Sequence, residues 1–154
     1  MLLVRDSLKM LRSQRVLEII LFFGILALYI HNLPRSIFPG DSGLLVSASY
    51  VGGIPHPPGY PLFTLLGFLI TRLSFVGHLS PAFLVGVLSA IFSSLACLLY
   101  FRLALHFSKS LLISFISTLI LSSIYLFWLM GETPEVFALN NFFILLLLYL
   151  AYFI

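Results

Sequence analysis

Apolar runs about as long as a lipid bilayer is thick constrain the fold of this chain more than any other feature. The first run, Val16–Leu33, holds 18 residues and a single charged side chain, Glu18. A helix needs about 20 such residues to cross the hydrocarbon core. Apolar residues make up 61% of the chain and charged residues 8%, whereas soluble domains carry about 25% charged residues. The sequence therefore predicts an all-α integral membrane protein with several transmembrane helices.

Basic residues before the first run predict its orientation. They are Arg5, Lys9, Arg12 and Arg15. Positive charge flanking a span stays on the cytoplasmic side. The run ends in Tyr29-Ile30-His31-Asn32, without the small-residue cleavage site of a signal peptide. We therefore expect an uncleaved first span, with the N-terminus in the cytoplasm and Arg35 outside.

The segment Tyr60–Val76 decides the rest of the topology. It is apolar and contains Pro61 and Arg72, and it is short, as re-entrant or interfacial segments often are. If it lies along the outer face, six basic residues fall inside and two outside; if it crosses, the count is five against three. The positive-inside rule prefers the first arrangement. We then expect an outer loop over 34–80 with short juxtamembrane helices, and spans at about 16–33, 81–101, 110–130 and 135–154.

A second outer loop separates the last two expected spans. It reads Gly131-Glu132-Thr133-Pro134-Glu135. Thr133 is predicted to cap the last helix and Pro134 to be its first residue, because both types favour these positions. In this topology Asp41, His56, Glu132 and Glu135 lie at the same outer surface.

The stretch from Gly40 to Pro61 is polar and rich in chain-breaking residues within an otherwise apolar sequence. It contains Gly40-Asp41-Ser42-Gly43 and, further on, Gly52-Gly53-Ile54-Pro55-His56-Pro57-Pro58-Gly59-Tyr60-Pro61. An acidic side chain and a histidine would pack less well here than leucine. The pattern indicates a functional site.

Three segments resemble the membrane glycosyltransferases of the GT-C fold, in the branch of the transmembrane protein O-mannosyltransferase-like proteins. They are Asp41-Ser42-Gly43, the run Gly53–Leu62, and Glu135-Val136-Phe137-Ala138-Leu139-Asn140. The resemblance extends from about Val16 to Ile154. It implies a GT-C-like N-terminal module and transfer of a sugar, with mannose among the candidates, from a polyprenyl-phosphate-linked donor. The acceptor would be a protein or a glycan on the outer or lumenal face.

The resemblance also implies roles for single residues. Asp41 corresponds to the aspartate that acts as general base or positions the acceptor, and a carboxylate can take the proton of an attacking hydroxyl. Arg72 and Arg35 are candidates for contact with the lipid phosphate. The substrate-binding residues predicted in this way are His56, Arg72, Glu132, Glu135 and Asn140.

No metal-ligand spacing occurs in the sequence, and no metal ligand or cofactor is predicted. Relatives often carry an acidic residue directly after Asp-Ser-Gly, where this chain has Leu44; a divalent metal stays open. The expected partners are the polyprenyl-phosphate sugar donor, the acceptor and the lipid bilayer. Nucleic acid is not expected, because the basic residues cluster near membrane ends. The location is the bacterial inner membrane or the endoplasmic reticulum.

Simpler explanations stand beside these roles. Asp41 would serve as a cap of the helix Ser42–Val51, Glu135 would complement the positive end of a helix, and Arg72 would extend to lipid head groups. A non-catalytic membrane subunit or remnant is one alternative function. A transporter fragment is another, although its ionisable residues would be expected at mid-membrane. We expect the N-terminal part of a larger protein, because the chain ends within the apolar run Ala151–Ile154.

Overall fold

The structure is a computed structural model that describes the backbone of residues 2–37 and 39–153, and the side chains of 11–37, 39–75 and 77–153. Within these ranges it contains eight helices and no strand. In chain order they are α1 (Leu2–Asn32), α2 (Ser42–Val51), α3 (Pro61–Thr71), α4 (Ser74–Gly77), α5 (Pro81–Ser108), α6 (Leu111–Ser123), α7 (Tyr125–Glu132) and α8 (Phe137–Phe153).

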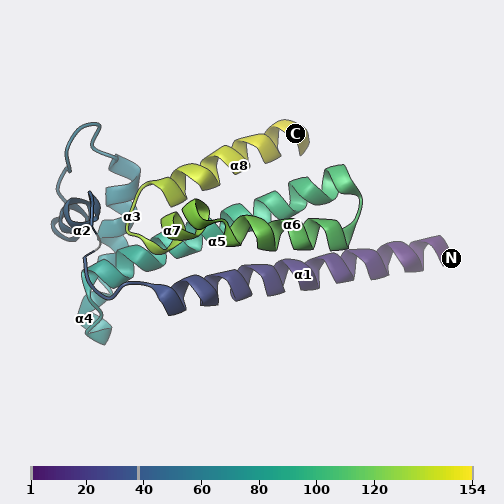
Figure 1. The fold of residues 1–154 in the computed structure, drawn as a ribbon, viewed down its shortest axis with the longest axis horizontal. Coiled ribbons are helices and arrows are strands. Elements are labelled where there is room, and N and C mark those ends of the chain that lie inside the picture. The colour runs from purple at the N-terminus through teal and green to yellow at the C-terminus, as the bar shows by residue number, and fades with distance from the viewer. Residues whose placement is uncertain (1, 38, 154) are drawn as a thin grey trace.

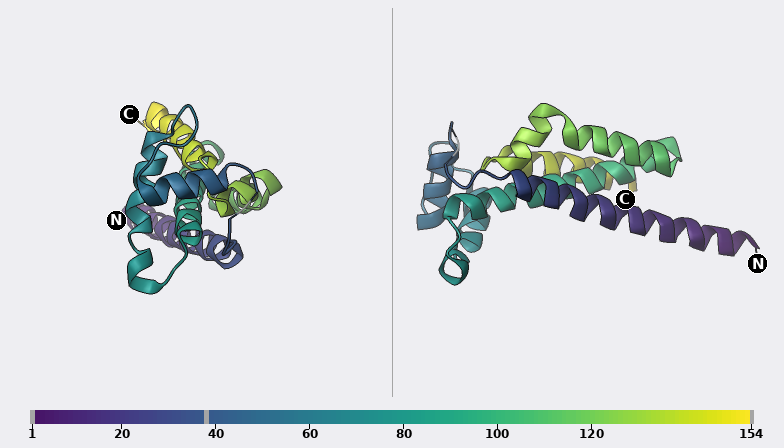
Figure 2. Two further views of the ribbon diagram at one scale, coloured as in Figure 1. Left: turned by 90° about the vertical axis from the view of Figure 1, so that its left-hand side faces the viewer. Right: turned by 60° about the horizontal axis from the view of Figure 1, so that its bottom comes forward.

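The long helices run side by side and the short helices gather at one end of them. Helices α1, α5, α6 and α8 follow the long axis of the molecule, while α2 and α3 lie across its left-hand end (Figure 1). Helix α5 is central and contacts α1, α3, α6, α7 and α8. Figure 2 shows the same arrangement from two other directions, with α2 and α3 gathered at one end of the long helices.

Two helices are long and apolar enough to cross a membrane, namely α1 over Leu11–Asn32 and α5 over Pro81–Ser108. Helices α6 and α7 pass the same test only as a pair, and α8 is a shorter apolar helix of 17 residues. The predicted all-α membrane fold, with short helices after the first span, is confirmed. The boundaries of the four spans and their orientation stay predictions.

The segment expected to be one span over 110–130 is not one straight helix. Backbone at Ile124 is extended (φ −63°, ψ 128°), and α6 and α7 meet at a bend of 67°. The Ser122 and Ser123 hydroxyls donate to Leu119 O at 2.9 and 2.8 Å, and such back-bonding competes with the helical ladder. The Tyr29 hydroxyl donates to Ser122 O at 2.8 Å. This contact between helices satisfies a carbonyl at the break.

The predicted cap of the last helix is wrong. Thr133 ends α7, because its N–H and its hydroxyl both donate to Leu129 O, at 3.1 and 3.0 Å. Helix α8 begins at Phe137 instead of Pro134. The segment between the two helices is therefore irregular, and Glu135 lies in it instead of in the first turn of a helix.

A hydrophobic cluster attaches the short helices to the bundle. Leu45 and Val46 of α2 and Phe63 of α3 pack with residues of α5 and α8, including Val85 and Leu139. Because the cluster joins all four helices, it places the loops at the ends of α2, α3 and α8 close to one another. A second cluster, of Leu21, Ile25, Tyr29, Ala90, Cys97 and Phe101, joins α1 to α5.

Candidate functional site

Asp41 and His56 form a polar pair at the end of the bundle that carries α2. Asp41 occupies the N-cap position of α2, yet its side chain makes no capping hydrogen bond. Its Oδ2 atom lies 3.1 Å from Nε2 of His56 instead. The aspartate side chain is 63% exposed and that of the histidine 37%. The carboxylate is therefore held by a side chain and is also accessible from outside.

The surroundings of His56 favour its charged form. Its Nδ1 atom lies 2.8 Å from Pro57 O, and its Nε2 atom faces the Asp41 carboxylate. A carbonyl oxygen and an ionised carboxylate only accept hydrogen bonds, so both ring nitrogens carry a proton when both contacts are made with the carboxylate ionised. The contact with Pro57 O, followed by that with Asp41, raises the pKa of His56 above its ordinary value.

The loop between α2 and α3 turns sharply after His56. The Gly59 N–H donates to His56 O at 2.9 Å, and Gly59 has a φ of +89°, which glycine adopts readily. Tyr60 follows with a φ of +39° and places its ring edge-on to the His56 ring, with centroids 5.9 Å apart. Tyr60 was not among the predicted site residues, although an aromatic residue within a run of chain-breaking residues was a signal for it.

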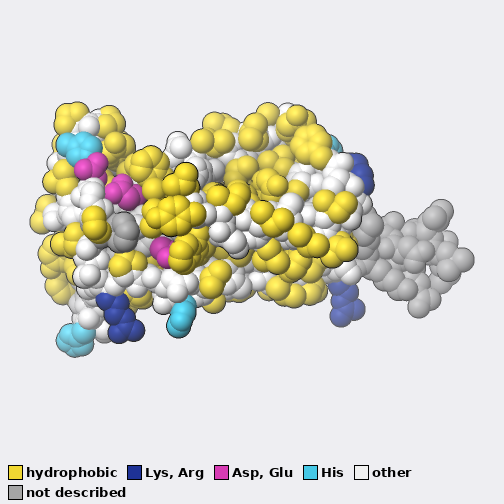
Figure 3. Space-filling model, in the orientation of Figure 1, with side chains coloured by type: hydrophobic (Ala, Val, Ile, Leu, Met, Phe, Trp, Pro, Cys, Tyr) yellow, Lys and Arg dark blue, Asp and Glu magenta, His cyan; other side chains and the backbone are white. Residues whose placement is uncertain are grey.

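Glu135 lies beside the pair. A Cβ atom at Gly40 would be 3.8 Å from Oε1 of Glu135, so this carboxyl group borders the residue next to Asp41. Burial and, secondly, the charge of Asp41 raise the pKa of Glu135. The structure thus brings together groups from three segments: the start of α2, the loop before α3 and the segment before α8. Figure 3 shows acidic side chains and a histidine gathered at this end.

Glu132 is placed differently from Glu135. It is only 7% exposed, and its Oε1 atom has no hydrogen-bond partner among the described residues. It lies near Asn32 and Trp128, at the junction of α1 and α7. The predicted substrate contact of Glu132 stays a prediction.

Arg72 is not brought to Asp41. Its guanidinium donates to Tyr50 O near the end of α2 and lies over the Phe68 ring, 4.3 Å from its centroid. Asp41 precedes the opposite end of the same helix, and ten residues of helix span about 15 Å. A contact of Arg72 with substrate stays a prediction, at a place separate from the pair.

Asn140 lies in an apolar groove that begins next to the pair. The groove measures about 420 Å³ and runs between the starts of α3 and α8. Its walls are Tyr60, Pro61, Leu62, Phe63, Val136, Phe137, Leu139, Asn140 and Phe143. Tyr60 contacts His56, and Val136 follows Glu135 in the chain. The groove therefore opens beside all three polar groups.

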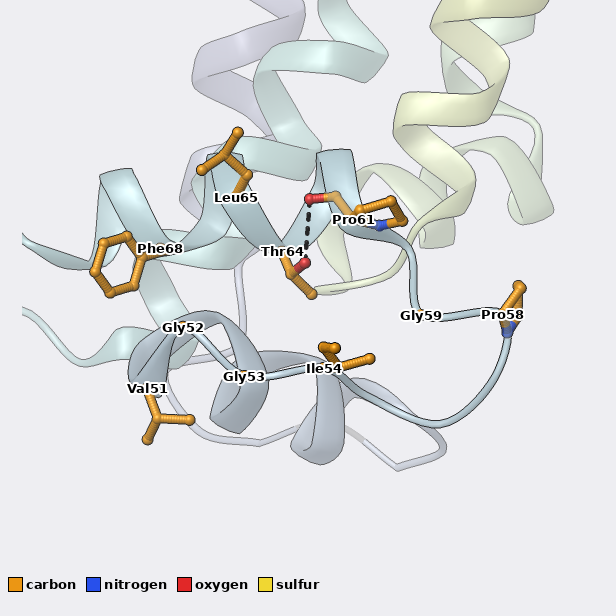
Figure 4. A pocket seen from close by; sticks show the side chains of 10 residues that line it. All are labelled: Val51, Gly52, Gly53, Ile54, Pro58, Gly59, Pro61, Thr64, Leu65 and Phe68. Carbon is orange, nitrogen blue, oxygen red and sulfur yellow. Dashed lines mark hydrogen bonds between the residues drawn. The ribbon is translucent and has the colours of Figure 1, made fainter.

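A second cavity of about 600 Å³ lies between the loop and α3. Figure 4 shows Ile54 and Thr64 facing one another across it, with Gly52 and Gly53 along the loop and Leu65 and Phe68 on α3. The Thr64 hydroxyl donates to Pro61 O at 3.2 Å. The side chains that line this cavity are mostly apolar.

No three His, Cys, Asp or Glu side chains of the described residues are placed to hold a metal ion. Asp41, His56 and Glu135 are neighbours, yet the groups are arranged as an ion pair and an adjoining carboxyl group.

Comparison with known proteins decides the family. The sequence model of the protein O-mannosyl-transferase TMEM260 N-terminal domain matches residues 41–154. The chain belongs to this family. The matched region begins at Asp41 and includes the loop of His56, the segment of Glu135 and the groove. The predicted relationship to O-mannosyltransferase-like proteins is thereby confirmed.

Two relatives show how much of the family's length is present. The chain is 38% identical over 131 residues to the mouse protein O-mannosyl-transferase TMEM260. The matched residues cover 85% of this chain and 18% of the mouse protein. It is 28% identical over 132 residues to the Dictyostelium discoideum protein O-mannosyl-transferase tmem260, covering 86% and 16%. The chain thus spans less than a fifth of the length of these relatives. No solved structure matches.

Proposed function

We propose that this chain is the N-terminal part of a membrane glycosyltransferase that moves a sugar, with mannose the first candidate, from a polyprenyl-phosphate-linked donor to a protein. The reaction takes place on the outer or lumenal side, in the endoplasmic reticulum if the protein is eukaryotic. The family and the names of both relatives support sugar transfer. The observation that carries the proposal is the Asp41–His56 pair. The Asp41 carboxylate makes no capping hydrogen bond to α2, and the pair lies beside an apolar groove.

Asp41 is the general base in this proposal. The acceptor hydroxyl attacks the anomeric carbon of the donor sugar and gives its proton to the Asp41 carboxylate. The bond between that carbon and the donor phosphate oxygen breaks, and polyprenyl phosphate leaves with the electron pair. The His56 ring lies against the Asp41 carboxylate, with Nε2 3.1 Å from Oδ2. This contact fixes the orientation of the carboxylate.

The groove between α3 and α8 is the proposed place for the first part of the polyprenyl chain. Its walls are apolar apart from a few groups such as the Asn140 amide. A prenyl chain there would put its phosphate next to His56, whose imidazolium supplies positive charge to the leaving group. Arg72 is at the far end of α2 and is the weaker candidate for this role.

The test replaces Asp41 by asparagine in the full-length protein. The change keeps the shape of the side chain and removes the base, so transfer should fall by about 10²–10⁴-fold. Asparagine keeps an acceptor oxygen for the His56 ring, so membrane insertion should match the wild type. Transfer from a polyprenyl-phosphate sugar is measured in proteoliposomes. Asp6→Asn, in α1 before the candidate span, is the matched control.

A second variant separates the base from a structural contact. If Asp41 serves only to hold the loop of His56, Asp41→Asn leaves transfer unchanged and Asp41→Ala lowers the melting temperature alone. Undiminished transfer by the asparagine variant would remove Asp41 from the chemistry. A non-catalytic role of this module would then be the better explanation.

A further inference from the structure

A second charged pocket lies at the opposite end of the bundle from Asp41. It measures about 450 Å³ and is formed by α1, α5 and α8. Arg15 and Glu18 line it from α1, Arg102 from α5, and Lys109 follows α5. Figure 3 shows basic side chains at this right-hand end, where Figure 1 places both chain termini. The proposed transfer reaction does not use this pocket.

The charge of the pocket is positive. Three cationic side chains, Arg15, Arg102 and Lys109, face one carboxylate, Glu18. Arg15 and Lys109 are exposed, so their charged groups are accessible to a ligand. The excess of positive charge selects an anionic ligand.

Glu18 holds one of the cations in place. Arg102 donates from Nε to Oε1 and from a terminal nitrogen to Oε2 of Glu18, both at 2.9 Å, and Gln14 donates to Oε1 at 3.0 Å. This two-fold pairing fixes the plane of the guanidinium. Because a guanidinium has five N–H groups, Arg102 keeps donors beyond the two that Glu18 accepts. The ion pair therefore orients Arg102 without occupying all of its hydrogen-bond donors.

The other walls match a lipid rather than a soluble anion. Leu11 and Leu105 are apolar, and the rings of Tyr149 and Phe153 stack at 4.5 Å between centroids. Two of the three helices around the pocket hold the candidate spans, and the pocket lies at the start of one and the end of the other. Basic pockets between membrane helices bind anionic lipid head groups. We propose that this pocket binds the phosphate of an anionic phospholipid, with the acyl chains along α8.

The test uses the full-length protein in detergent and short-chain phosphatidylglycerol as the probe. Bound lipid is counted by native mass spectrometry, with phosphatidylcholine of equal chain length as the comparison. Arg15→Gln with Lys109→Gln removes two cations that are outside the ion pair, so the fold should be kept. Each single substitution is expected to lower affinity for phosphatidylglycerol by about fivefold, and the double variant is expected to lower it by about 25-fold. Arg12→Gln, an exposed residue of α1 that does not line the pocket, is the matched control and should change nothing.

The proposal is supported if phosphatidylglycerol is preferred over phosphatidylcholine and the preference is lost only in the double variant. Equal binding of both lipids would overturn it, as would full preference in the double variant. Millimolar inorganic phosphate is added in a further arm. If it displaces phosphatidylglycerol completely, the pocket is a site for free phosphate and the lipid proposal is wrong. A lipid-dependent rise of the melting temperature, absent in the double variant, gives a second readout.

Discussion

His56 shows how the local charge of the candidate site is set by single contacts. Its two ring nitrogens meet Pro57 O and the Asp41 carboxylate, and both contacts raise its pKa. Glu135 also raises the pKa of His56 by its charge, while its own pKa is raised by burial. A site with one base and one cation therefore depends on three neighbouring side chains.

The titration of His56 tests this interaction. NMR of histidine-labelled protein should give a pKa above the ordinary value, and Asp41→Asn should lower it without abolishing the rise, because the Pro57 contact remains. Since the folded-state pKa is raised, the stability that the contact provides is present at acidic pH and is lost as pH rises through that pKa. The spectrum of His56→Gln assigns the signal. A His56 pKa that does not change in Asp41→Asn would contradict the pairing.

Helices α2 and α3 carry the candidate site because they approach one another at glycine. A Cβ atom at Gly67 of α3 would lie 2.3 Å from Oγ and 2.7 Å from Cβ of Ser49 on α2. Backbone can come this close only where one helix lacks a side chain. The pair of helices then supports the loop between them, on which His56 is located.

Gly67→Ala should separate these helices. Overpacking of this kind costs about 1–3 kcal/mol, so the melting temperature in detergent should fall. Adding Ser49→Gly removes both clashing atoms and should recover most of the loss, relative to Ser49→Gly alone. Gly24→Ala is the control, because nothing lies within 4 Å of that position. If Gly24→Ala and Gly67→Ala lower the melting temperature equally, the close approach of α2 and α3 is not what matters.

The whole molecule has two chemically different ends. Asp41, His56 and the apolar groove lie at one end. The Glu18–Arg102 ion pair and the basic pocket lie at the other. The topology in which the segment Tyr60–Val76 does not cross the membrane is preferred by the positive-inside rule and stays a prediction.

Cysteine labelling tests that topology. In a Cys97→Ser background, single cysteines replace Ile54, Phe137 and Lys109, which are all exposed. A membrane-impermeant maleimide added from outside should label positions 54 and 137, and position 109 only after the membrane is opened. Labelling of 54 and 137 from opposite sides would separate His56 from Glu135 and end the proposal of a shared site.

The sequence by itself was enough to predict the all-α membrane class, the short helices between the first two long ones and the family, because hydropathy, chain-breaking residues and motifs are local properties. It also singled out Asp41 and His56. Only the tertiary structure decided which partner each polar group takes: His56 instead of a helix N–H for Asp41, Tyr50 O for Arg72, and Leu129 O for Thr133. It likewise divided α6 from α7 at Ile124. Several partners compete for each such group, and the winner is set by packing between distant segments, which no local pattern contains.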